Sequence, residues 1–164
     1  MKVGSLQIES VLRHDHERLD ALLTTSTRRD DREAYESFRA GLLRHIGIEE
    51  KILIPFLRRR RPDSPTSVVR QLRLDHAALA SLLVPTPTAA ILQRLRTVLE
   101  AHNPLEEGEG GFYDICARLA ANDEAELLAR IQNAPAVPLA SHYDGPRAFA
   151  NIDRLLRAAG RPPV

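Results

Sequence analysis

Apolar residues recur every three or four positions along most of the first 100 residues, the spacing of one face of an α-helix. The clearest stretch is LLRHIGIEEKILIPFL, residues 42–57. Its apolar stripe includes a histidine and a glutamate: Phe38, Leu42, His45, Glu49, Ile52 and Phe56. A buried imidazole or carboxylate must be paired, hydrogen-bonded or bound to metal, because an isolated buried charge is too costly. The stripe therefore predicts a helix whose buried face carries chemistry.

The same pairing of histidine and glutamate occurs a second time. In LEAHNPLEE, residues 99–107, His102 and Glu106 are four positions apart, as His45 and Glu49 are. Residues four apart lie on one face of a helix, so each pair can hold an ion between an imidazole and a carboxylate. One such pair is weak evidence, because any glutamate-rich helix produces it by chance. Two copies in matching positions are a strong signal.

A shorter histidine segment precedes each copy. VLRHDHERLDALL (11–23) aligns with QLRLDHAALASLL (71–83), and the alignment matches His16 with His76. The chain thus reads as a doubled helical hairpin, each half giving one histidine and then a His-x-x-x-Glu motif. Four histidines and two glutamates from four helices have the ligand count of a dinuclear metal site. The predicted metal ligands are His16, His45, Glu49, His76, His102 and Glu106.

The predicted fold class is all-α. The first helix is expected over about 5–25, a polar loop at 24–31, and the second helix from there to about residue 60. After a turn with a cap at Thr66 or Ser67, the third helix should reach about residue 84, and the fourth should begin near residue 88. Residues 112–121 are expected to continue the fourth helix after a glycine break. Two C-terminal helices, 123–132 and 147–160, should flank a proline-rich loop.

Composition restricts the function and the location. The chain has 164 residues, which fits one domain (1–164), with the bundle in about 5–121 and a C-terminal extension in about 122–164. The net charge of +1 gives no case for a nucleic-acid partner. No apolar run reaches the roughly 20 residues needed to span a membrane, and the N-terminus turns charged too early for a signal peptide. A single cysteine, Cys116, fits a reducing cytoplasm and is expected to be a small buried residue.

These motifs resemble those of the hemerythrin-like family, the bundles that carry the HHE cation-binding domain. The resemblance covers residues 5 to about 115 and rests on Asp15-His16, His45-x-x-x-Glu49-Glu50 with Pro55 downstream, Asp75-His76, and His102-x-x-x-Glu106-Glu107. It implies an up-down-up-down four-helix bundle around a non-haem di-iron (Fe) centre, with or without an oxo bridge. Glu49 and Glu106 would bridge the irons, and the four histidines would be terminal ligands.

The chain departs from the family pattern in two places. Oxygen-carrying hemerythrins pair two histidines on the third helix, whereas this chain has Leu72 and Ala80 four residues to either side of His76. The missing ligand leaves a coordination position empty or filled by water, which suits a reactive or sensing site better than an oxygen carrier. After the second glutamate pair, GEGGFYD (108–114) replaces an apolar, aromatic and proline stretch. This replacement makes the geometry of the fourth helix less secure.

Three further residues have the chemistry of metal ligands. His14 lies about 200° round the helix from His16 and is expected at the surface. Glu109 shares the face of the second His-x-x-x-Glu motif, but at a helix end where solvent exposure is expected. His142 lies in the proline-rich loop with no partner at ligand spacing, so we expect a structural hydrogen bond there.

The first functional prediction is a di-iron protein that binds or senses O2 or NO, or reduces peroxide. The alternative is a metal-stabilised structural or protein-interaction module, filled for example by zinc, that acts through its C-terminal helices or through Arg58–Arg61. Histidine and carboxylate ligands suit iron, manganese (Mn) and zinc (Zn), and the sequence does not choose among them. An absorption spectrum separates the two readings, since oxo-bridged ferric pairs absorb in the near ultraviolet and zinc does not.

Overall fold

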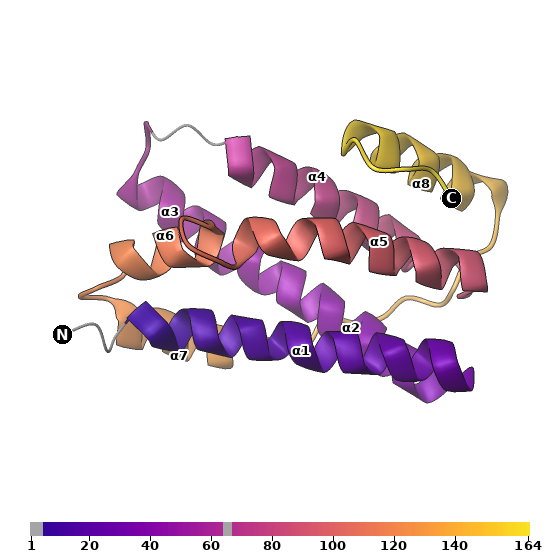
Figure 1. Cartoon of the computed structure of the whole chain (residues 1–164), viewed down its shortest axis with the longest axis horizontal. Helices are drawn as coiled ribbons and strands as arrows, with labels where there is room; N and C mark the ends of the chain where they lie inside the picture. Colours follow the sequence, from indigo (N-terminus) through magenta and orange to yellow (C-terminus); the bar gives the residue numbers. More distant parts are fainter. Residues whose placement is uncertain (1–4, 64–66) are drawn as a thin grey trace.

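The computed structural model describes residues 5–63 and 67–164, and this part of the chain consists of helices and loops with no strand. It confirms the all-α prediction. The four long helices are α1 (Ser5–Arg29), α2 (Arg32–Ile48), α4 (Ser67–Leu82) and α5 (Ala89–Glu106). They lie side by side, and the sequence colours of Figure 1 show that consecutive long helices run in opposite directions. The site described below lies between these four helices.

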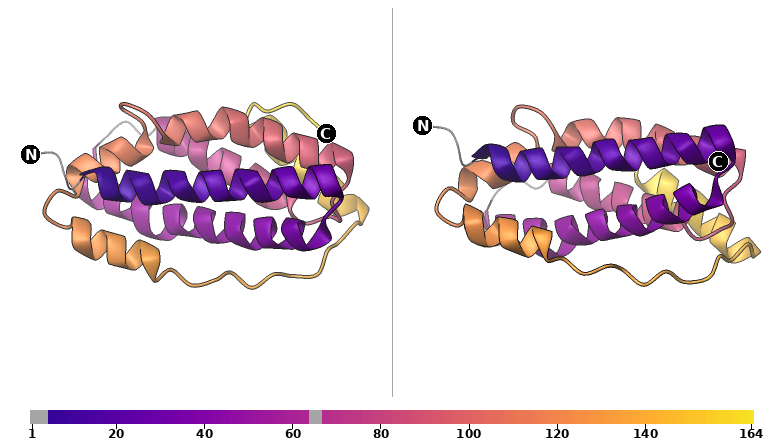
Figure 2. Two further views of the ribbon diagram at one scale, coloured as in Figure 1. Left: turned by 60° about the horizontal axis from the view of Figure 1, so that its bottom comes forward. Right: turned by 90° about the horizontal axis from the view of Figure 1, so that it is seen from below.

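Shorter elements complete the fold. A π-helical turn η1 (Glu49–Leu53) and α3 (Ile54–Arg60) extend α2, while α6 (Phe112–Leu119), α7 (Glu124–Gln132) and α8 (Pro146–Ala158) follow α5. An extended segment between α7 and α8 runs along the outside of the bundle, as Figure 2 shows. It carries the chain to the opposite end, where α8 packs against α4. The C-terminal extension therefore touches both ends of the bundle.

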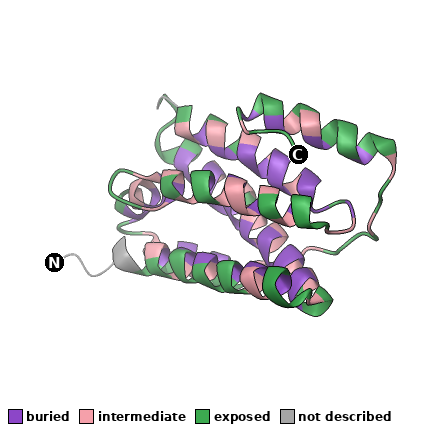
Figure 3. Ribbon diagram, turned by 45° about the vertical axis from the view of Figure 1, so that its right-hand side comes forward, coloured by how far each residue is buried: buried purple, intermediate pink, exposed green. Residues whose placement is uncertain are grey.

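The core consists of two apolar clusters with the predicted ligands between them. Along α1, His16 separates Leu12 of one cluster from Leu19 of the other. Along α4, His76 separates Leu72 from Leu79 in the same way. Outward-facing positions are largely exposed (Figure 3), and none of the described helices combines the length and apolarity needed to cross a membrane. The predicted ligands thus lie in the middle of a leucine-rich core.

The predicted loop at 24–31 is wrong, because α1 continues to Arg29. Tertiary packing overrides the weak helix propensity of this polar stretch. Ser26 is buried, and the Thr27 hydroxyl donates to the Leu23 carbonyl at 2.8 Å. The chain turns at Asp30, whose φ of 50° is left-handed, and the Asp31 side chain caps α2.

The predicted helix after the glycine break is present, but as the separate helix α6, which ends at Leu119 and not at residue 121. Helix α5 ends at Glu106, and the following turn contains Gly108 at φ 94° and Gly110 at φ 76°. Glycine adopts these left-handed angles without the steric cost that a Cβ atom brings. After the turn the chain continues toward the same end of the bundle as α6, which packs against α1. The predicted cap at Thr66 lies outside the described residues, and Ser67 is the first residue of α4.

Candidate metal centre

All six predicted ligands are buried at the middle of the bundle, each with at most 8% of its surface exposed. Their side chains form two groups that share Glu49 and Glu106. The first group adds His16 and His45, and the second adds His76 and His102. The donor atoms within each group lie within 4.8 Å of one another. The structure therefore brings the six residues together as two adjacent groups of donors, each of which could hold one ion.

Each shared carboxylate directs one oxygen to each group. Glu49 Oε1 is 3.3 Å from His45 Nε2, and Glu49 Oε2 is 2.9 Å from His76 Nε2. Glu106 Oε2 is 3.1 Å from His16 Nε2, and Glu106 Oε1 is 2.8 Å from the Nε2 atom of His102. Two donors that are each about 2.1 Å from one ion, at right angles, lie about 3 Å apart. The spacing fits two ions bridged by two carboxylates.

Three buried atoms of this cluster make no hydrogen bond of proper geometry within the described part of the chain, although each has a close neighbour in the cluster: Glu49 Oε2, His76 Nε2 and Glu106 Oε1. Buried polar atoms in folded proteins nearly always have a partner. All three atoms belong to the second group, where a cation would supply the missing partner. The cluster therefore fits a metal centre better than a hydrogen-bonded polar core.

A second layer of carboxylates orients the four histidines. The Nδ1 contacts are His45 to Asp15 at 2.8 Å, His76 to Glu50 at 2.8 Å, His102 to Asp75 at 3.1 Å, and His16 to Glu107. In every case the carboxylate comes from a different helix than the histidine, and it is next to a predicted ligand in its own helix. The four contacts form a closed ring around the bundle. Each leaves Nε2 free to face the centre, an arrangement that fixes the tautomer and orientation of metal-binding histidines.

The π-helical turn η1 places two neighbouring glutamates on one histidine. The Ile54 N–H donates to the carbonyl of Glu49, five residues back, and Pro55 follows without an N–H of its own. A proline ring also collides with the carbonyl four residues before it, so the wider turn relieves that contact. As a result, Glu49 faces Nε2 of His76 while Glu50 contacts Nδ1.

The cluster binds protons strongly in the absence of metal. Burial is the largest single influence on His45 and lowers its pKa, but Glu49, Asp15 and Glu106 together outweigh it and raise the pKa to about 10. The surrounding carboxylates, Glu106 first, raise the pKa of His76 to about 11. For His102, Glu106, Asp75 and Glu49 together overcome the lowering by burial and raise the pKa to about 9. Protons thus balance the buried carboxylates where cations would otherwise do so.

One residue of the centre is not among those predicted from the sequence. The Tyr113 hydroxyl, from α6, lies in the first group, with 1% or less of the side chain exposed. It donates to Glu49 Oε1 at 2.5 Å and lies 3.0 Å from His45 Nε2 and 3.1 Å from His16 Nε2. Burial and the charges of Glu49 and Glu106 raise the pKa of this phenol well above its ordinary value. The only sequence signal was a rare aromatic residue after a glycine turn.

The C-terminal tail contacts one of the four carboxylates that orient the histidines. Arg161, just beyond α8, donates Nε to Asp75 Oδ1 and Nη2 to Asp75 Oδ2, both at 2.8 Å. Asp75 in turn holds His102. A forked arginine contact of this kind fixes both the position and the charge of a carboxylate. The extension therefore supports one histidine of the second group.

The three other candidate ligands lie outside the cluster. His14 is exposed on α1 and lies 3.6 Å from Glu17, and Glu109 is exposed in the turn after α5. His142 contacts the Pro85 carbonyl at 3.0 Å and the carboxylate of Glu36. Cys116 is buried in the core, and burial raises the pKa of its thiol to about 12.

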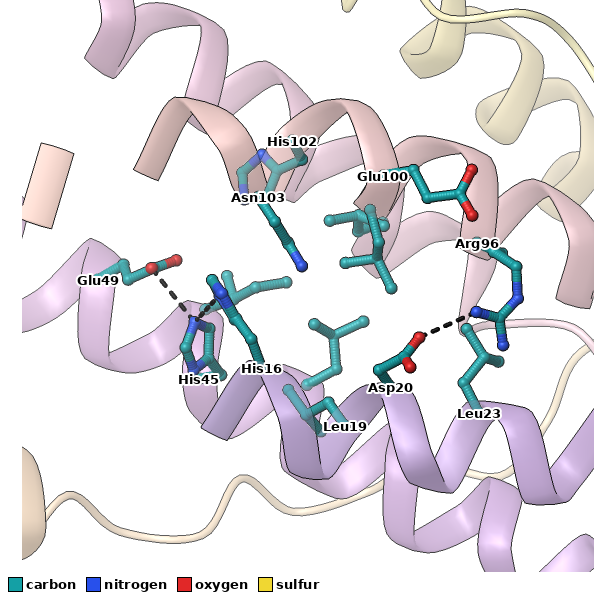
Figure 4. A pocket seen from close by; sticks show the side chains of 14 residues that line it. His16, Leu19, Asp20, Leu23, His45, Glu49, Arg96, Glu100, His102 and Asn103 are labelled. Atoms are coloured by element: carbon teal, nitrogen blue, oxygen red, sulfur yellow. Dashed lines mark hydrogen bonds and ion pairs between the residues drawn. The ribbon is translucent and has the colours of Figure 1, made fainter. Parts of the chain in front are cut away.

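A small pocket opens beside the centre, between α1, α2 and α5. Its volume is about 70 Å³, which is room for a few water-sized molecules. Figure 4 shows His16, His45, Glu49, His102 and Asn103 at its inner end, with an Arg96–Asp20 ion pair of 2.9 Å further out. Leucine side chains line much of the remainder: Leu19, Leu23, Leu42, Leu79 and Leu99. The pocket is the right size for a diatomic molecule or a peroxide.

Comparison with known proteins identifies the family. Residues 7–110 match the hemerythrin HHE cation binding domain, which is more than half of the chain. No curated protein and no solved structure is similar enough to give a significant match. The matched residues include the six predicted ligands and all four carboxylates of the outer ring, but neither Tyr113 nor Arg161. The chain therefore belongs to the hemerythrin family of HHE cation-binding domains.

Proposed function

We propose that this protein holds two iron ions between its four long helices and uses them to bind or sense O2 or NO, or to reduce peroxide. His16 and His45 would hold one ion and His76 and His102 the other. Glu49 and Glu106 would bridge the pair. Iron in such a centre supplies reversible electron transfer and an open coordination position. The proposal is supported by the family and by the two donor groups that share both carboxylates.

The surroundings favour a small and weakly polar ligand. The pocket of about 70 Å³ excludes a sugar, nucleotide or peptide, and its outer wall is mostly leucine. At its inner end lies Asn103, whose side-chain nitrogen points into the pocket in Figure 4. We infer that this amide orients a small molecule beside the centre. Asn103→Leu is expected to raise the dissociation rate of that molecule without removing metal.

The direct test is metal analysis of protein expressed with ample iron and purified in air. The proposal expects two iron ions per chain and near-ultraviolet absorption. Stopped-flow mixing of the reduced protein with O2 or NO, and assays of peroxide consumption, would then separate the three activities. His16→Ala together with His76→Ala is the matched control, because it removes one predicted ligand from each ion position. The proposal fails if the wild-type protein retains less than one iron per chain under these conditions.

A zinc-filled structural module is the second candidate. The observation that favours it is the ring of contacts between the helices, which surrounds the central donors. Ions bound to those donors would join all four long helices, whatever the chemistry of the metal. Zinc also accepts histidine and carboxylate ligands. Protein that takes up two zinc ions in competition with iron, with no near-ultraviolet absorption and no reaction with O2, NO or peroxide, would establish this second function.

A further inference from the structure

We propose that Tyr113 is a seventh metal ligand, which binds iron at the first ion position through its phenolate oxygen. The inference rests on the proposed function, because it assumes that an iron pair occupies the centre. Tyr113 lies outside the residues that match the family, on a helix that follows the glycine turn. Its assignment comes from the geometry of the first group alone.

The Tyr113 hydroxyl contacts every donor of the first group. Besides the 2.5 Å contact with Glu49 Oε1, the hydroxyl oxygen lies 3.0–3.1 Å from His45 Nε2, His16 Nε2 and Glu106 Oε2. A phenol donates one hydrogen bond and accepts at most two, so hydrogen bonds of the hydroxyl account for three of these four neighbours and not for the fourth. Five donors about 3 Å apart instead describe the coordination shell of one cation. The hydroxyl occupies a vertex of that shell.

The two ion positions are consequently unequal. The first has five protein donors, whereas the second, with Glu49, His76, His102 and Glu106, has four in the described residues. When iron binds, the phenol proton is released to solvent and the phenolate oxygen takes up the metal bond. A phenolate adds a negative charge to the first position and stabilises the ferric state there. The second position retains the open coordination site for a small molecule.

Ferric phenolate centres have a phenolate-to-iron charge-transfer band in the visible, and excitation into it enhances tyrosinate ring vibrations; zinc centres and ferric centres without phenolate lack this band. The experiment compares visible absorption and resonance Raman spectra of the ferric wild-type protein and of Tyr113→Phe. We expect a visible band with tyrosinate ring vibrations in the wild type and its complete loss in the variant, with the near-ultraviolet absorption retained. Ring-deuterated tyrosine, incorporated into the wild type, should shift the Raman bands.

The chain offers a matched control. It contains three tyrosines, of which Tyr35 is also buried but lies in the apolar cluster at the other end, and Tyr143 is half exposed. Tyr35→Phe is expected to keep the visible band. A wild-type protein with two ferric ions but no visible band would overturn the assignment and leave the proposed function intact, even if Tyr113→Phe did not fold. A protein that binds no iron would overturn both.

Discussion

The two halves of the bundle carry the same motif but receive different support. In the first half, α1 and α2 bring His16 and His45, and α6 adds the Tyr113 hydroxyl directly among the donors. In the second half, α4 and α5 bring His76 and His102, and the tail adds Arg161 one layer further out, on Asp75. The repeated helices specify a symmetric pair of donor groups. The unrepeated C-terminal segments make the two positions chemically different.

The difference suggests a division of labour under the proposed function. A position with an additional anionic donor holds its ion tightly and favours the higher oxidation state, whereas one with four donors keeps room for an external ligand. Arg161 affects the second position only indirectly. Its positive charge is paired with the Asp75 carboxylate, and Asp75 in turn contacts His102. The following experiments test whether the two halves of the bundle differ in how they bind metal.

The largest effect is expected for the shared carboxylates, because they belong to both halves. Glu49→Ala or Glu106→Ala should reduce the metal content from two ions per chain towards zero. Glu50→Ala and Glu107→Ala should keep both ions with about 10–100-fold weaker affinity, since they act only through His76 and His16. Metal content after dialysis checks this. Loss of metal from Glu50→Ala but not from Glu49→Ala would contradict the assignment of the bridging residues.

Removal of the metal should cost several kcal/mol of stability, with a fall in melting temperature on the order of 10 °C, because only the folded chain assembles the site. The apo protein should remain helical but loosen most at residues 102–111, where Pro104 and three glycines weaken the helix end. Calorimetry and hydrogen exchange of the two forms measure this. Coincident melting curves would show that the six residues share no ion.

The loss of folding stability caused by removing the metal should increase with pH. The pKa values of His45, His76 and His102 are raised from an ordinary 6.5 to about 9–11. The protonated histidines therefore stabilise the metal-free fold fully below pH 6.5, and this stabilisation is lost as the pH rises through about 9–11. The lowered pKa of Glu49 acts oppositely: its contribution is present above pH 4.5 and is lost as pH falls below it. Metal must displace the protons, so its benefit rises with pH. Melts at pH 6 and pH 9 test this, and a smaller difference at pH 9 would contradict it.

The sequence predicted the six buried residues of the cluster because each lies on an apolar stripe of its own helix, and periodicity reports that directly. It did not predict the carboxylate ring, because a helical wheel shows where a side chain points but not what the next helix presents. Glu50 and Glu107 lie off the stripes, yet each meets a histidine of another helix. Tyr113 is positioned by a glycine turn and Arg161 by a long extended segment. Neither segment has a hydrophobic periodicity from which its path could be predicted.

A smaller effect, confined to one ion, is expected from the histidines of the first half. His16→Ala should lower the metal content by about one ion per chain, because the Nε2 atom of His16 serves only the first group. His14→Ala, two residues away, should leave the metal content unchanged, since that side chain is exposed. Equal losses in the two variants, measured by elemental analysis, would mean that the orientation of α1 is wrong.

The smallest effect should come from the support that the tail gives to the second half. Arg161→Gln removes the forked contact with Asp75 but leaves Asp75 on His102, so the affinity of the second ion should fall by about tenfold or less. Arg157→Gln, on the exposed face of α8, is the matched control and should have no effect. Stepwise metal titration resolves the two ions, because only the weaker one should shift. If Arg161→Gln instead weakened the first ion, which Tyr113 adjoins, the two halves would be coupled through the shared carboxylates. The separate support of each half by its own C-terminal segment would then be wrong.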